Sequence, residues 1–246
     1  MKRISEMSPR FKARLAGAFE LLEGSTSTIG QVVILGRLVI AGDAAATAAN
    51  LVGHQRLVWL GFASSLAGVA LHLAWALLMY ELLKPVDRTV ARLSVFAVLV
   101  CCALQALAAV LFVAPLVVLN AANAASAFTP QQSQALMQVF FRLNGYAFDA
   151  DLVFFGLWCF LTGSLIFKST FLPRVFGVLL MLDGLGWMTY IAPPFAVHLF
   201  PVIAAVSGLA ELPLPLWLLI VGVNAERWNE QAAAAGGRPA GSSPTG

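Results

Sequence analysis

Apolar stretches long enough to cross a lipid bilayer recur along this chain, and they constrain its fold more than any other feature. Residues 93–119 contain no charged side chain, and Gln105 lies near their middle. A transmembrane helix needs about 20 predominantly apolar residues. Only 11% of the 246 residues are charged and 60% are hydrophobic, whereas soluble domains carry about 25% charged residues. The composition therefore favours lipid as the solvent.

The sequence predicts an all-α fold, a polytopic membrane helical bundle of six transmembrane helices. A short amphipathic outer helix, 135–144, is expected before the fourth span, after a long loop at 120–134. Pro85 is expected to end the second span, and Ser169 or Thr170 to cap the fifth. The expected spans are residues 15–36, 57–82, 93–119, 146–167, 173–193 and 196–224.

The distribution of lysine and arginine predicts the orientation of these spans. Twelve of the 15 basic residues fall at the ends and loops of one side, and only Arg37, Arg56 and Arg142 fall on the other. Cytoplasmic loops carry the excess of Lys and Arg, so both termini are expected to be cytoplasmic. We expect a cytoplasmic basic N-terminus at 1–13, a transmembrane domain at 14–225 and a disordered cytoplasmic tail at 226–246.

Apart from Glu81 at the end of the second span, six acidic side chains lie within the expected spans, where a carboxylate costs at least about 2.5 kcal/mol. They predict a bundle with a polar interior, which is the candidate functional site. Helical rise puts Glu23, Asp183, Glu211 and Gln105 near one level, with Glu20 and His72 nearer the cytoplasm. The six acids are Glu20, Glu23, Asp149, Asp151, Asp183 and Glu211.

These residues predict a polar column that binds or conducts a proton or a cation. Asp149 and Asp151 would form its outer access point, although residues two apart on a helix cannot both face the core. Glu20 and Glu23 are three apart and share a helix face. His72 is the only basic side chain well inside a span. The alternative is that these groups only hydrogen-bond across helices and specify packing.

Glu211 is the strongest single candidate because a helix break is expected beside it. Pro213 and Pro215 follow it, and each proline removes a backbone donor and displaces a carbonyl one turn earlier. Irregular backbone within a membrane is tolerated inside protein or along a watery cavity, and transporters place binding sites at such breaks. A simple kink that neighbouring helices repair is the alternative.

Other classes of site have little support in the sequence. Cys101, Cys102 and Cys159 lie in apolar segments, as small hydrophobic residues do. There is no metal-ligand spacing and no phosphate-loop or dinucleotide-binding glycine pattern, so no metal and no cofactor are expected. The net charge of +3 is explained by basic residues at span ends and needs no nucleic-acid partner. The expected partners are the lipid bilayer and a small solute, proton or cation.

Four stretches of the sequence resemble a bacterial membrane family, the domain of unknown function 4386. The most specific is Lys168-Ser-Thr-Phe-Leu-Pro-Arg-Val-Phe-Gly177, and the others are 42–50, 80–86 and Glu211 with Leu216-Trp217. The resemblance covers about residues 14–223. It implies a six-span protein of the bacterial inner (cytoplasmic) membrane and carries no activity.

Three functions stay open from the sequence alone. The first is an integral membrane protein with a protonatable acidic core that binds or moves a proton, cation or small solute. The second is a structural or regulatory bundle whose acids only pack. The third is an intramembrane lipid-modifying enzyme in which His72 and an acid transfer a proton, although the sequence favours a protein that is not an enzyme.

Overall fold

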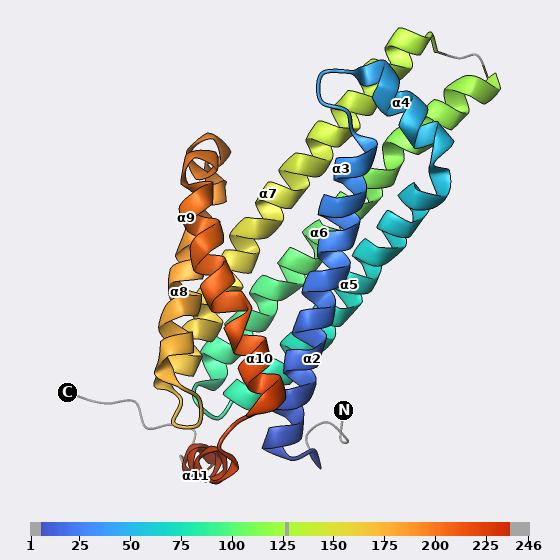
Figure 1. Cartoon of the computed structure of the whole chain (residues 1–246). Coiled ribbons are helices and arrows are strands. Elements are labelled where there is room, and N and C mark those ends of the chain that lie inside the picture. Colours follow the sequence, from blue (N-terminus) through green and yellow to red (C-terminus); the bar gives the residue numbers. More distant parts are fainter. Residues whose placement is uncertain (1–5, 126–127, 237–246) are drawn as a thin grey trace. The chain divides into compact units, whose positions relative to one another are not determined.

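The computed structural model describes residues 6–125 and 128–236, and this part of the chain is helical with no strand. Figure 1 labels the helices along the chain. They are α2 (Pro9–Thr28), the π-helix η1 (Ile29–Ile34), α3 (Leu35–Leu38), α4 (Ala44–Gly53), α5 (Gln55–Leu83), α6 (Arg88–Ala125), α7 (Pro130–Lys168), α8 (Arg174–Met188), the 3₁₀ helix η2 (Thr189–Ile191), α9 (Pro193–Glu211), α10 (Pro213–Ile220) and α11 (Ala225–Gly236).

Five helical stretches are long and apolar enough to cross a membrane, which suggests a membrane protein. They are Gln55–Leu83, Arg88–Ala121, Pro130–Lys168, Arg174–Ile191 and Pro193–Ile220, and they contain most of the second to sixth expected spans. The expected first span, 15–36, is helical but is not among the five. It carries Glu20 and Glu23, and the π-helix interrupts it.

Three expected loops or tails are partly helical, because a polar side chain caps each helix. Thr129 and Gln132 form a reciprocal capping box, with Thr129 N donating to Gln132 Oε1 (2.9 Å) and Gln132 N to Thr129 Oγ1 (3.2 Å). The predicted loop 120–134 is therefore wrong, since α7 already begins at Pro130 and α6 ends at Ala125. The predicted outer helix 135–144 is the early part of α7 and continues into the fourth span without a break.

Similar N-caps start a helix in each of the other two segments, the connection that contains Asp43 and the tail. Asp43 Oδ1 accepts from Ala46 N (2.8 Å) and starts α4 in the connection between the expected first and second spans. Asn224 Oδ1 accepts from Arg227 N (3.1 Å) at the start of α11. The tail expected to be disordered from residue 226 is thus helical to Gly236, and 237–246 lie outside the described residues.

The predicted cap of the fifth span is also wrong. The residue before α8 is Pro173, and no side chain caps this helix end. Ser169 Oγ donates instead to Ile166 O (2.8 Å), one turn back in α7.

The chain forms two compact units, which are described separately. Unit 1 contains Met1–Glu20, Ala74–Val98 and Val153–Gly246, and unit 2 contains Leu21–Leu73 and Leu99–Leu152. The helices α2, α5, α6 and α7 each contribute residues to both units.

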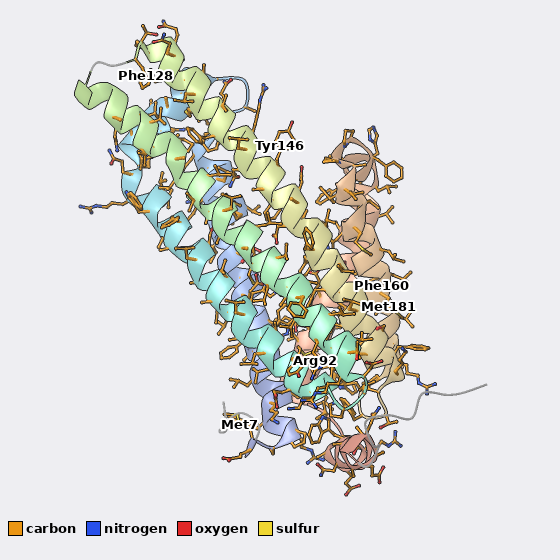
Figure 2. The ribbon with its side chains drawn as sticks, turned by 180° about the vertical axis from the view of Figure 1, so that it is seen from behind. Met7, Arg92, Phe128, Tyr146, Phe160 and Met181 are labelled. Carbon is orange, nitrogen blue, oxygen red and sulfur yellow. The ribbon has the colours of Figure 1, made fainter. Side chains whose placement is uncertain are left out.

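In unit 1, close backbone approaches hold pairs of helices together. A Cβ atom added to Gly163 of α7 would lie 2.8 Å from Gly177 O and Met181 N of α8, and one added to Gly156 would lie 2.6 Å from Gly184 O. Phe160 on α7 and Met181 on α8 accordingly lie near one another in Figure 2. A Cβ atom on Gly17 of α2 would likewise collide with Pro215 O of α10. Helices can approach this closely only where glycine leaves the backbone uncovered.

One end of unit 1 joins four segments of the chain. Lys12 of α2 lies 3.7 Å from Glu81 of α5. Trp228 Nε1 of α11 donates to Leu82 O (2.8 Å), and Asn224 N donates to Phe171 O in the turn between α7 and α8 (3.2 Å). The start of α2, the end of α5, this turn and the start of α11 therefore meet.

Unit 2 has an apolar core to which α3, α4, α5, α6 and α7 contribute. Asn144 Nδ2 of α7 donates to Ala108 O of α6 (2.7 Å) and ties these two helices together. The core residues are Ile34, Leu38, Leu51, Val58, Phe112, Val113, Leu116, Leu119 and Met137.

Candidate functional site

Asp183 and Glu211 lie together in unit 1. Asp183 of α8 is fully buried, and Ser207 Oγ of α9 donates to its Oδ1. Glu211, the last residue of α9, is within hydrogen-bonding reach of the Asp183 carboxyl group. Trp187 Nε1 donates to Glu211 Oε1 (3.0 Å). Since a hydrogen bond between two carboxyl groups needs a donor, the pair has a place for one shared proton.

Helical spacing explains why these four side chains converge. Asp183 and Trp187 are four residues apart on α8, and Ser207 and Glu211 are four apart on α9. Residues four apart share a helix face, and helical side chains lean toward the N-terminus. Trp187 and Glu211 thus reach back toward the level of Asp183 and Ser207.

Two further groups of unit 1 belong to this cluster. Cys159 of α7 is fully buried and lies within hydrogen-bonding reach of Asp183. Glu20 of α2 is 8% exposed and close enough to interact electrostatically with Cys159. We call Glu20, Cys159, Asp183, Ser207 and Glu211 the acidic cluster. Its Asp183 Oδ2 atom is buried and has no well-aligned hydrogen-bond donor among the described residues.

The helix break predicted beside Glu211 is confirmed. α9 ends at Glu211, α10 begins at Pro213, and Leu212 lies between them. Proline is favoured at the first position of a helix because its missing N–H group would have no partner there. The break therefore places the Glu211 carboxyl group at the C-terminal end of α9.

A second polar cluster lies in unit 2. His72 Nδ1 of α5 is 3.9 Å from Glu23 Oε1 of α2, and Ser27 Oγ donates to the same oxygen (2.8 Å). Gln105 of α6 is within hydrogen-bonding reach of both Glu23 and His72. His72 is fully buried, so its ring nitrogens contact protein groups and not solvent.

Asp151 of α7 faces the interior of unit 2, whereas Asp149 does not. Asp151 is 2% exposed and within hydrogen-bonding reach of Cys101 of α6, and Asp149 is only half-buried. This difference agrees with the prediction that residues two apart cannot both face the core.

The residues expected in one polar column thus divide between the units. Asp183, Glu211 and Glu20 belong to unit 1, and Glu23, His72, Gln105, Asp149 and Asp151 belong to unit 2. A single column that includes all of them stays a prediction.

Sequence reasoning missed the hydrogen-bond donors of the acidic cluster. Ser207 lies four residues before Glu211, and Trp187 four after Asp183, so a search for polar side chains on the same helix face would have found both. Cys159 gives no such signal, because a cysteine in an apolar helix is usually a packing residue. Among the described residues, no group of three or more His, Cys, Asp or Glu side chains is arranged to hold a metal ion.

Comparison with known proteins finds one family. The model of the family described as "Domain of unknown function (DUF4386)" matches residues 15–222, which confirms the resemblance seen in the sequence. No curated protein and no solved structure matches the chain.

Proposed function

Because the chain belongs to the DUF4386 family, whose description assigns no activity, we propose its function from the acidic cluster alone. The protein is an integral membrane protein that binds a proton between Asp183 and Glu211, as part of binding or moving a proton, a cation or a small solute. The observation that carries this proposal is the contact between two carboxyl groups beside a helix break.

The surroundings of the pair support proton binding. Ser207 and Trp187 donate neutral hydrogen bonds to the two carboxyl groups. Asp183 is fully buried and Glu211 is half-buried. Two carboxylates at contact distance repel each other when both are ionised, so a shared proton is the simplest neutralising group.

The proposed topology has six spans, and the first, 15–36, lies within α2, η1 and α3. These three elements are continuous from Pro9 to Leu38, which is ample length for a span. Glu20 is buried within unit 1, so the polarity of this helix does not require it to lie outside the bilayer.

Both termini are proposed to be cytoplasmic, in the bacterial inner membrane. The segments that carry Lys12, Lys84, Arg174 and Arg227 meet at one end of unit 1. The connections with few basic residues meet in unit 2, where a pocket is lined by residues of α4, α6 and the start of α7. This grouping supports the orientation derived from the basic residues.

Infrared spectroscopy of the purified protein in lipid tests the shared proton directly. Protonated carboxyl groups have a carbonyl stretching band that carboxylates lack, and the wild type should keep such a band at neutral pH. Glu211→Gln and Asp183→Asn should each shift and weaken it, because either change replaces one of the two carboxyl groups that share the proton. Asp149→Asn is the control and should leave the band unchanged, since Asp149 is half-buried in unit 2.

Thermal unfolding in detergent distinguishes proton binding from simple packing. Glu211→Gln should unfold near the wild-type temperature, because an amide replaces a protonated carboxyl group. Glu211→Leu should lose about 1–3 kcal/mol, since the Trp187 N–H group is left without its acceptor. A neutral-pH band that keeps its wild-type position and intensity in both Glu211→Gln and Asp183→Asn would exclude the shared proton and favour a bundle whose acids only pack.

A further inference from the structure

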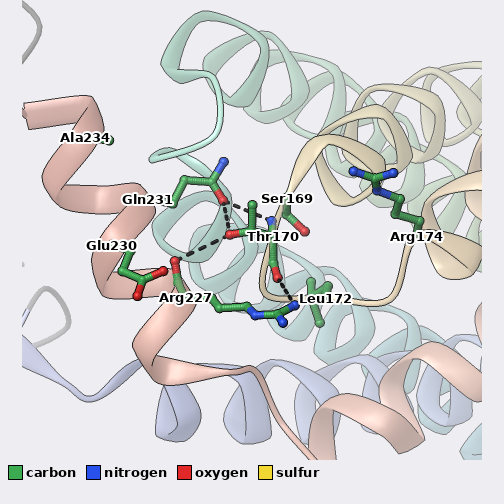
Figure 3. A pocket seen from close by; sticks show the side chains of 8 residues that line it. All are labelled: Ser169, Thr170, Leu172, Arg174, Arg227, Glu230, Gln231 and Ala234. Atoms are coloured by element: carbon green, nitrogen blue, oxygen red, sulfur yellow. Dashed lines mark hydrogen bonds between the residues drawn. The ribbon is translucent and has the colours of Figure 1, made fainter.

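A pocket of about 670 Å³ lies in unit 1 beside the turn that joins α7 to α8. Figure 3 shows its lining, with α11 on one side of the turn and Arg174, the first residue of α8, on the other. It shares no residue with the acidic cluster. The pocket is therefore a separate candidate binding site.

Hydrogen bonds fix the α11 side of this pocket. Gln231 Oε1 accepts from both Thr170 N and Thr170 Oγ1 (3.1 Å each). Arg227 Nη1 donates to Thr170 O (3.4 Å). A guanidinium group has five N–H donors, so most of those on Arg227 are left for a ligand, as is the NH₂ group of Gln231.

The other side of the pocket presents a second guanidinium group. Arg174 lies over the Phe167 ring, 5.8 Å from its centroid. Stacking on an aromatic ring uses the face of the guanidinium and leaves its N–H edge available. Arg174 and Arg227 therefore both supply the planar donor groups that recognise phosphate.

The lining also contains a single carboxylate, that of Glu230. In the described part of the chain, neither Arg174 nor Arg227 forms an ion pair with it. Two cations and one anion that do not neutralise each other fit a ligand that carries both a phosphate and an ammonium group.

The position of the pocket indicates where such a ligand comes from. α7 and α8 are both candidate membrane spans, so the turn between them lies at a membrane surface. Leu172 and Ala234 add apolar contacts to the lining. Basic pockets next to spans on the cytoplasmic side bind lipid headgroups.

We propose that this pocket binds the headgroup of a phospholipid of the phosphoethanolamine class. Arg174 and Arg227 hold the phosphate, and Glu230 accepts from the primary ammonium group. Gln231 donates to a phosphate oxygen.

Native mass spectrometry of the delipidated full-length protein tests this proposal with short-chain lipids. Dihexanoyl phosphatidylethanolamine should bind more tightly than the phosphatidylglycerol and phosphatidylcholine forms, because only it has both a phosphate and a primary ammonium group. Arg174→Gln and Arg227→Gln should each weaken its binding by about tenfold or more, the effect of losing one charge-assisted hydrogen bond. Arg92→Gln is the matched control, since Arg92 is exposed on α6 and outside the pocket (Figure 2).

The proposed contact between the Glu230 carboxylate and the ammonium group is tested separately. Glu230→Gln should weaken phosphatidylethanolamine binding and leave phosphatidylglycerol binding unchanged or stronger. Glu226→Gln, one turn earlier on α11, should change neither. Because the chain has six tryptophans, the Trp228 signal is taken as the difference between each variant and the same variant with Trp228→Phe. This difference reports whether α11 stays docked at Leu82 O.

Three results would overturn the proposal. One is equal binding of phosphatidylethanolamine and phosphatidylglycerol with no effect of Glu230→Gln. The second is lipid binding that Arg174→Gln and Arg227→Gln leave intact. The third is soluble glycerophosphoethanolamine or inorganic phosphate binding as tightly as the lipid, which would identify a free phosphate compound as the ligand.

Discussion

At the scale of single residues, the acidic cluster depends on hydrogen-bond donors that come from two different helices. Asp183 and Glu211 are conspicuous because a carboxyl group is costly in an apolar helix. Ser207 and Trp187 are ordinary residues in such helices, and only the packing of α8 against α9 brings them to the carboxyl groups. The pairing of Glu23 with His72 has the same origin, since α2 and α5 bring them together.

Lys12 is a further residue whose environment the sequence did not predict. It was counted among the basic residues of a cytoplasmic end, yet it is 1% exposed. Its Nζ atom lies 3.7 Å from Glu81 Oε2 and 5.6 Å from the centre of a Trp228 ring. Burial removes water from the ammonium group and lowers the pKa of Lys12 below its ordinary value of 10.5, although Glu81 opposes this shift.

The lowered pKa of Lys12 predicts a stability that rises with pH. Between the folded-state pKa and 10.5, the unfolded chain binds more protons than the folded chain, so the free energy of unfolding increases with pH. The gain is complete above 10.5 and is lost as the pH falls through the folded-state pKa. Urea unfolding in mild detergent from pH 8 upward measures this rise.

Lys12→Met should flatten the rise, because methionine fills the space without a titrating group. Lys84→Met is the matched control, since Lys84 pairs with the same Glu81 (2.7 Å) but its side chain is 33% exposed. The Lys84→Met variant should keep most of the rise, because loss of water is the largest cause of the lowered Lys12 pKa and the charge of Lys84 is a smaller one. The assignment to Lys12 is refuted by a rise that persists unchanged in Lys12→Met.

At the scale of helices, apolar length predicted most of the second to sixth expected spans. Residues that start or end a helix were harder to interpret. Pro213 correctly predicted the break before α10. Thr129 and Asp43 were placed between expected spans and Asn224 at the end of the sixth, yet each starts a helix. The same residue types favour turns and N-caps, because their short polar side chains bind nearby backbone N–H groups. The sequence alone does not decide whether a turn or a helix follows such a residue.

The close contact between α7 and α8 at their glycines predicts that the stability of the protein depends strongly on side-chain size at these positions. Gly163→Ala should destabilise the protein by about 1–3 kcal/mol, since the new Cβ atom would meet α8 backbone atoms that cannot move alone. Gly145→Ala, on the same helix, meets nothing within 4 Å. It should be neutral or stabilising by up to about 1 kcal/mol, because alanine is the better helix former.

Thermal unfolding of both variants in the same detergent measures the contrast. Equal effects of the two substitutions would mean that α7 and α8 are not in backbone contact at Gly163.

At the scale of the whole chain, the distribution of basic residues remains the basis for orientation. Reporter fusions at two sites test it. A reporter after Gly246 should be active in the cytoplasm, and one within residues 126–129 should be active outside, because the chain would cross the membrane an odd number of times between them. Two reporters active on the same side would refute the six-span topology.

The contact between α2 and α10 has a consequence for biogenesis. α2 and α10 lie side by side in Figure 1. Gly17 approaches Pro215 O closely, although almost two hundred residues separate them. A ribosome makes α2 first and α10 near the end, and chains begin to fold while they are being made. The helix that carries Lys12 and Glu20 is therefore complete long before α10, and its early contact is with α5, through Lys12 and Glu81. Truncation before α10 should remove the packing at Gly17 and leave that face of α2 as the surface that membrane quality-control proteases recognise.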